Sequence, residues 1–153
     1  MALTELEEKT ERLTEMLARE NLGAVLLNAQ HNFAWLTGGS TNGIDLSREN
    51  GAASLLVTRS GKRYLLANNI EMPRMLAEEV SADDFEPADF SWQEEKAIGD
   101  TALKKAKILA DGDIATDIPL FGGAAAIEGK IAHCRYKLTD HEISRYRELG
   151  RDA

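Results

Sequence analysis

A short, continuously apolar run, Ala24-Val25-Leu26-Leu27, constrains the fold of this chain more than any other feature. It follows Gly23 directly and ends at Asn28. Such a run is typical of a β-strand that is buried on both faces, because a strand with one face in solvent alternates apolar and polar residues. We therefore expect a buried strand over 24–28.

The segments around this strand predict helices and further strands. Thr4 and Glu7 form a capping box, which predicts an amphipathic helix as far as Asn21. The other predicted elements are a brief helix or turn before Gly38-Gly39, a long loop to Gly51, an antiparallel hairpin of 53–58 with 63–67, a helix over 70–80 with Pro73 in its first turn, an edge strand over 84–90, a long helix from a Ser91/Glu94 capping box through Ile98, Ala102, Ala106 and Leu109 to Gly112, and a strand over 113–118. Between Phe121 and Arg135 the signals conflict, so helix and strand both stay open there. This order predicts an α/β fold with a mixed β-sheet of about five or six strands, flanked by helices.

Composition excludes several classes of function. The formal net charge of −8 opposes a surface that tracks nucleic-acid phosphates. Cys134 is the single cysteine, so an intrachain disulfide is impossible, and no apolar stretch approaches the ~20 residues that span a bilayer. The first residues lack a basic flank followed by an apolar run. We expect a soluble cytoplasmic domain that binds neither nucleic acid nor membrane.

The motifs that carry chemistry fail when their spacing is tested. His141-Glu142 begins like the zinc-protease H-E-x-x-H, but Arg145 stands where the second histidine belongs. Cys134 lies beside His133, but sequence neighbours point to different sides of a helix or strand, so a small buried or half-buried thiol is the simpler interpretation. Asp111, Asp113 and Asp117 lack the pattern of a calcium loop; turn chemistry explains the first and a strand end the last. The residues predict neither a catalytic constellation nor a metal site.

The segment Asn32-Phe33-Ala34-Trp35-Leu36-Thr37-Gly38-Gly39, with the polar loop after it, leaves two interpretations open. In the first, Phe33 and Leu36 belong to the core and Trp35 fills a gap beneath the loop. In the second, a loop rich in hydrogen-bonding groups rests on an aromatic base and forms a binding rim.

The C-terminal segment predicts a helix with an uncovered face. Thr139 and Glu142 form a further capping box, and Ile143, Tyr146 and Leu149 then fall on one side of the helix. Such a stripe needs a following element to cover it. We therefore expect a domain over 1–138, with a linker candidate at 135–139, and over 139–153 the start of a linker helix into a second, absent domain.

In this order and spacing, the chain resembles the N-terminal domain of the creatinase, prolidase and aminopeptidase P family, the M24 or pita-bread metallopeptidases. The resemblance covers nearly the whole chain. Its carriers are 22–27 followed by Asn32-Phe33-Ala34-Trp35-Leu36-Thr37-Gly38, which is similar to the family's N-x-x-Y/W-L-T/S-G turn, then 56–58 with Gly61-Lys62, and 135–143, which resembles the junction into the catalytic domain.

The resemblance implies a non-catalytic domain with a mixed sheet. Catalysis in the family belongs to a C-terminal domain, where two aspartates, a histidine and two glutamates hold two divalent metal ions of the Mn, Co or Zn type. No residue of this chain matches those five. The implied partners are its own C-terminal catalytic domain, further copies in a homodimer or higher oligomer, and a short peptide substrate whose access the domain helps to wall. The residues carried over to that wall are Asn32, Phe33, Trp35, Thr37, Gly38 and Gly39.

The resemblance thus implies that this chain alone hydrolyses nothing and that its parent is a metal-dependent Xaa-Pro dipeptidase or aminopeptidase, a hydrolase. Two alternatives stay open. The domain is a stand-alone binding or oligomerisation module, or it is the matching domain of a creatinase-type C–N hydrolase. The sequence departs from common members of the family at Asn68-Asn69-Ile70-Glu71.

Overall fold

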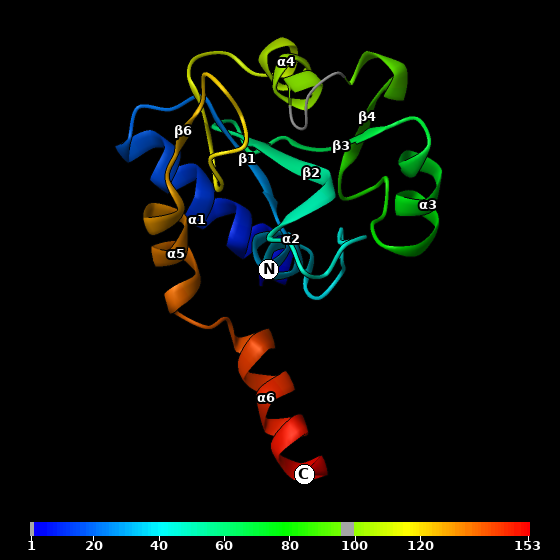
Figure 1. Cartoon of the computed structure of the whole chain (residues 1–153). Coiled ribbons are helices and arrows are strands. Elements are labelled where there is room, and N and C mark those ends of the chain that lie inside the picture. The colour runs from blue at the N-terminus through cyan, green and yellow to red at the C-terminus, as the bar shows by residue number, and fades with distance from the viewer. Residues whose placement is uncertain (1, 96–99) are drawn as a thin grey trace.

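A computed structural model describes residues 2–95 and 100–153 of the chain (Figure 1). Its centre is a six-stranded sheet in the order β4-β3-β2-β1-β5-β6. The strands are β1 Ala24–Ala29, β2 Asn50–Thr58, β3 Arg63–Asn68, β4 Glu86–Phe90, β5 Ile114–Thr116 and β6 Ala125–Ala126. β2 is antiparallel to β1 and β3, whereas the β1–β5, β3–β4 and β5–β6 pairs are parallel. The predicted mixed sheet, the β2–β3 hairpin and the edge position of β4 are therefore confirmed.

The central strand β1 is buried along its whole length because helices cover both faces of the sheet. Val25 and Leu27 face one apolar cluster, with Leu13 of helix α1 (Glu5–Arg19) and Phe33 of helix α2 (Gln30–Thr37). Ala24 and Leu26 face a second cluster, which includes Leu103 and Ala106 of helix α4 (Asp100–Leu109). Adjacent residues of a strand point to opposite faces, so two apolar layers require a continuous apolar run. The prediction drawn from this run is confirmed.

Most helices begin and end where their local signals place them. The bounds are α1 Glu5–Arg19, α2 Gln30–Thr37, α3 Glu71–Glu78, α4 Asp100–Leu109, α5 Glu128–Tyr136 and α6 Asp140–Asp152. The Thr4 capping box of α1 is present, and Gly38 ends α2 in the left-handed conformation at φ 76°. Pro73 is the third residue of α3 and so lies in its first turn, as predicted. Just before α3, Asn68 Oδ1 accepts from the N–H groups of Ile70 and Glu71.

The predicted capping box at Ser91 is wrong. Ser91 has an extended backbone and its side chain makes no capping hydrogen bond. Trp92–Glu94 form a short 3₁₀ helix instead of the first turn of a long α-helix, and Glu95 is not helical. The N–H of Trp92 donates to Asn69 Oδ1 at 2.9 Å, so a tertiary contact fixes this turn. Ile98, placed in the same predicted helix, lies outside the described residues.

The segment that the sequence left open contains both kinds of structure. β6 occupies Ala125–Ala126, and α5 follows from Glu128 to Tyr136. Because α5 extends to Tyr136, the linker is shorter than the predicted 135–139 and consists of residues 137–139. Figure 1 shows α6, in orange and red, leading away from the sheet and its covering helices. The predicted Thr139 capping box is present at its start.

Candidate functional site

The six residues predicted to wall a substrate path do not form one site, because α2 and the turn after it place them in different surroundings. Phe33 is fully buried in the core. Asn32 lies in a polar network with β5 and α5. Trp35, Gly38 and Gly39 line a groove against α1 and α6. The interpretation of Phe33 as a core residue is therefore confirmed.

Asn32 joins two carboxylates beneath the start of α2. Its Nδ2 donates to Asp117 Oδ2 at 3.0 Å and to Glu128 Oε2 at 2.7 Å. Its Oδ1 accepts from the guanidinium of Arg135. Asn32 is 0% exposed, so every polar atom of its side chain has to find a partner inside the protein. Through these hydrogen bonds Asn32 connects α2 to the residue that follows β5 and to α5.

The pKa values of the Asp117 and Glu128 carboxyl groups are shifted in opposite directions. Burial raises the pKa of Asp117, and the N–H donors of Asn28, Asn32 and Ala29 oppose that rise. Burial also raises the pKa of Glu128, but hydrogen bonds from His31, Asn32 and Arg135 outweigh it and leave the pKa lowered. Asp117 accepts from the N–H groups of Asn28 and Ala29 at the carboxyl end of β1, where α2 begins. Its role in this geometry is to fix the start of α2.

Thr37 also serves the backbone of α2. Its Oγ1 donates to the carbonyl of Phe33 at 2.8 Å and accepts from the N–H of Ser40 at 3.1 Å. Together with the left-handed Gly38, these bonds end the helix and start the loop over 39–49. Thr37 thus shapes the rim without lining the groove.

The groove beside Trp35 has a volume of about 280 Å³ and lies where α1, α2 and α6 meet. Trp35 is half-buried, and its Nε1 has no hydrogen-bond partner among the described residues. The Lys9 ammonium lies 5.3 Å from the centroid of a Trp35 ring and donates to the Trp35 carbonyl at 2.6 Å. On the side of α6, Tyr146 and Leu149 line the groove. It therefore combines an indole face, a buried cation and an exposed apolar stripe.

Lys9 and Glu5 anchor α6 to α1. Lys9 Nζ lies 2.6 Å from Glu5 Oε1 and 3.0 Å from Glu142 Oε1, and the Lys9 side chain is only 1% exposed. Arg145 forms two bonds of 2.7 Å with the Glu5 carboxylate. The Arg145 hydrogen bond is the main cause that lowers the pKa of Glu5 from 4.5 to about 2. The first two turns of α6 are thus held by charge.

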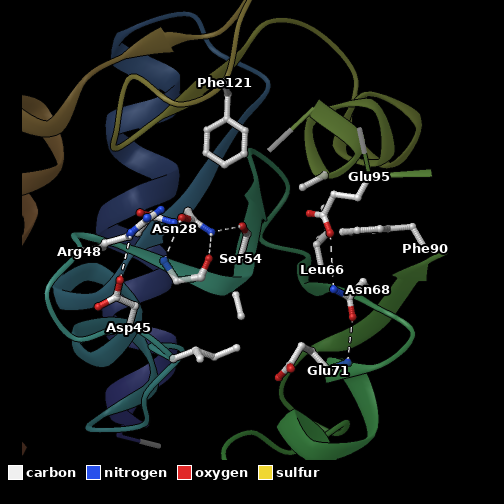
Figure 2. Close-up of a pocket in the computed structure, with 15 residues that line it drawn as sticks. Asn28, Asp45, Arg48, Ser54, Leu66, Asn68, Glu71, Phe90, Glu95 and Phe121 are labelled. Carbon is white, nitrogen blue, oxygen red and sulfur yellow. Dashed lines mark hydrogen bonds and ion pairs between the residues drawn. The ribbon is translucent and has the colours of Figure 1, made fainter. Parts of the chain in front are cut away.

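A second hollow, which we call the edge cleft, lies at the carboxyl edge of the sheet (Figure 2). Its volume is about 330 Å³. Asn28, Asn68 and Phe90 stand at or next to the carboxyl ends of β1, β3 and β4, and the antiparallel β2 begins there. In open α/β sheets this edge is the usual place for ligands.

Comparison with known proteins gives the chain its family. The model of the creatinase/prolidase N-terminal domain matches residues 9–147, which is most of the chain. The chain belongs to this family. A search of curated protein sequences finds no significant match.

Solved structures of peptidases share the fold of this creatinase/prolidase N-terminal domain. An Xaa-Pro dipeptidase from Bacillus anthracis matches with a TM-score of 0.60 at 16% identity, over 91% of this chain and 38% of that one. The prolidase from Pyrococcus horikoshii OT3 gives 0.59 at 18% identity, over 90% and 37%. An aminopeptidase P from Streptococcus thermophilus gives 0.55 at 14% identity, over 86% of this chain and 99% of that one. The chain therefore spans well under half of the first two structures.

The described part of this creatinase/prolidase N-terminal domain contains no group of three or more His, Cys, Asp or Glu side chains that could hold a metal ion. In the same residues, no helix is long and apolar enough to cross a membrane. Cys134 is buried, as predicted, and burial raises the pKa of its thiol. A thiol with a raised pKa is a poor nucleophile at neutral pH.

Sequence reasoning missed Lys9, Asp117 and the edge cleft. Lys9 follows Leu6 by three residues and precedes Leu13 by four, so it stands within the apolar stripe of α1. A lysine at such a position is a signal that it needs buried partners. Asp117 directly follows a buried strand, and the residues around it in the sequence do not indicate that it binds the start of α2. The edge cleft is lined by residues of four strands, of α3 and α4 and of the segments that connect the elements, and only the folded sheet brings them together.

Proposed function

We propose that this domain is the non-catalytic N-terminal part of a metal-dependent Xaa-Pro peptidase and that the groove beside Trp35 helps to wall the entrance to the active site. The family match over 9–147 carries the proposal. Further support comes from the likeness in fold to an Xaa-Pro dipeptidase and a prolidase that are much longer than this chain. The metals, of the Mn, Co or Zn type, would then belong to the catalytic domain.

The geometry of α6 supports a partner beyond this domain. Four large apolar side chains between the end of α5 and the last turns of α6 are exposed, namely Tyr136 at 71%, Leu138 at 41%, Tyr146 at 63% and Leu149 at 64%. Exposed apolar surface of this kind marks an interaction site. The proposed occupants are the catalytic domain of the same chain and a second copy in a homodimer or higher oligomer. The single cysteine is consistent with a cytoplasmic location.

The test is the substitution Trp35→Ala in the full-length parent. The indole can narrow a cleft and exclude water, but it cannot activate a nucleophile. We expect a higher KM for short Xaa-Pro peptides, or cleavage of longer ones, with a smaller loss in kcat. Trp92→Ala is the matched control, because Trp92 is 50% exposed and does not line this groove.

Steady-state kinetics and melting temperature are measured on the same preparation. A destabilised enzyme with normal KM and normal length preference would assign Trp35 to the core and reject the proposed role. The 153-residue chain, incubated with manganese or cobalt and Xaa-Pro dipeptides, should hydrolyse nothing. Turnover that copurifies and scales with the chain would contradict the proposed division of labour.

A further inference from the structure

The edge cleft has a hydrogen-bonding floor with spare donors. Ser54 is 2% exposed, and its Oγ accepts from Asn28 Nδ2 at 2.8 Å. A hydroxyl also carries a proton to donate, and no described residue accepts it. The Asn68 amide resembles Ser54 in this respect. Its Oδ1 accepts two backbone N–H groups, while its Nδ2 has one long contact of 3.5 Å to Glu95 Oε2. Both groups lie in the cleft in Figure 2.

Opposite charges stand on the two sides of this floor. Figure 2 shows Arg48 on one side, beside Asp45, and Glu95 on the other, beside Phe90. Arg48 pairs through its Nε with Asp45 at 3.1 Å, and Asp45 lines the cleft as well. The guanidinium of Arg48 has further N–H donors that a ligand can use. Glu71, which also lines the cleft, is neutralised by Arg74 at 2.7 Å, whereas Glu95 has no ion pair among the described residues. The cleft therefore offers guanidinium N–H donors at one end and the Glu95 carboxylate at the other.

Apolar groups complete the lining of the cleft. Leu66, Phe90 and Phe121 contribute to the walls, as Figure 2 shows. The volume of about 330 Å³ is near the lower limit of the ~300–1,000 Å³ that is usual for ligand pockets. A small ligand with an apolar body and two opposite charges satisfies these features together.

We infer that the edge cleft binds a short zwitterion, a free dipeptide with an apolar side chain. The dipeptide carboxylate would accept from Ser54 and Arg48, its peptide carbonyl from the Asn68 amide, and its ammonium would face Glu95. The apolar side chain would lie against Phe90 and Phe121. The inference goes beyond the proposed function, since the ligand is held and not cleaved. The groove beside Trp35 shares no lining residue with this cleft.

The experiment titrates the 153-residue chain with leucyl-alanine and follows backbone amide shifts by NMR. We expect saturable shifts at the ends of β1, β3 and β4. N-acetyl-leucyl-alanine lacks the ammonium and leucyl-alaninamide lacks the carboxylate, so both should bind about tenfold more weakly or not at all. Equal binding of either blocked peptide, or no saturable shift with leucyl-alanine, would overturn the inference.

Two substitutions at the charged ends give a second readout. Glu95→Gln and Arg48→Gln should each weaken binding of leucyl-alanine roughly tenfold. Both side chains lie at the surface, so the fold should be unaffected, and the melting temperature checks this. Glu94→Gln and Arg147→Gln are matched controls, because both residues are exposed and neither lines the cleft. Unchanged affinity in the two test variants, or the same loss in the controls, would reject the site.

Discussion

The first and the last helix begin in the same way and are then held by different forces. In α1 the Thr4 Oγ1 accepts from the N–H of Glu7 at 3.2 Å, and in α6 the Thr139 Oγ1 accepts from the N–H of Glu142 at 3.1 Å. In return, the carboxylate of each glutamate accepts from the backbone N–H of its threonine at 2.8 Å. Yet α1 buries five residues, whereas none of the 13 residues that the structure describes in α6 is buried.

This difference separates two properties that a capping motif is often taken to give together. The capping box determines where a helix starts, because it satisfies the unpaired N–H groups of the first turn. Burial of an apolar face then determines how strongly the helix is held. α6 has the first property without the second. Its attachment depends on the ion pairs that Glu142 and Arg145 make with Lys9 and Glu5 of α1.

The largest effect should come from shortening a leucine in each helix. Leu13 of α1 is 0% exposed, and Leu149 of α6 is 64% exposed. We expect Leu13→Ala to lower the free energy of unfolding by about 2–5 kcal/mol, since it leaves a cavity in the core. Leu149→Ala should change it by less than about 0.5 kcal/mol. Denaturant unfolding measures both, and a similar loss in Leu149→Ala would mean that the stripe of α6 is covered in solution.

The next effect should come from the buried charge between the helices. Lys9→Met keeps a long side chain but leaves Glu142 without its cation, at 13% exposure. We expect the free energy of unfolding to fall by about 1–3 kcal/mol. This is less than the ~3–5 kcal/mol lost when a fully buried ion pair is broken, because Glu5 still pairs with Arg145. Amide hydrogen exchange in α6 should become faster. Lys104→Met is the control, since that side chain is 76% exposed, and unchanged exchange in α6 would show that Lys9 does not anchor it.

Local sequence patterns predicted an element correctly where the order of apolar and polar residues reflects the surroundings of that element. The continuous run in β1 predicted burial on both faces, and α4 and α1 supply the two covers. The capping box predicted at Ser91 is absent, although Ser91 and Glu94 match the capping-box pattern as well as Thr4 and Glu7 do. Here the N–H of Trp92 binds Asn69, and the N–H of Glu94 binds the backbone carbonyl of Ser91. A tertiary contact thus replaced the local cap.

The candidate sites depended on contacts that no local pattern carries. Asn32 was placed beside Trp35 on an access wall, but it binds Asp117, which is 85 residues away in the chain. That bond exists because β1 and β5 pair in the sheet. Trp35, one turn further along α2, meets Lys9 and α6 instead. Local spacing could place both side chains on one helix but could not supply their partners.

Removing each cap in turn gives a smaller effect that isolates the comparison. Thr4→Ala and Thr139→Ala each remove one capping hydrogen bond, which contributes about 0.5–2 kcal/mol to a helix. In α1 the loss should appear in global stability, because unfolding α1 exposes the core. In α6 it should appear as faster amide exchange with nearly unchanged melting temperature. An equal fall in melting temperature for both variants would show that α6 unfolds together with the core.

The smallest effect should appear in α6 on acidification. Contact with Arg145 lowers the pKa of Glu5 from 4.5 to about 2, against the opposing effect of burial. A lowered pKa in the folded state means that the ion pair stabilises α6 fully above about pH 4.5 and that this stabilisation is lost as the pH falls toward 2. Glu142 has a lowered pKa as well, with hydrogen bonds from Thr139 and Lys9 outweighing its burial, so it acts in the same direction.

NMR titration of the Glu5 carboxyl and of the α6 amides tests this dependence. The α6 signals should move through the same pH window as the Glu5 carboxyl. In Glu5→Gln, which cannot ionise at that position, α6 should be loosened already at neutral pH and respond less to acid. Glu15→Gln changes an exposed residue of the same helix and should leave the pH dependence of α6 as it is in the unsubstituted chain. If Glu5 instead titrates near 4.5, Arg145 does not hold it in solution, and α6 depends on Lys9 and its capping box.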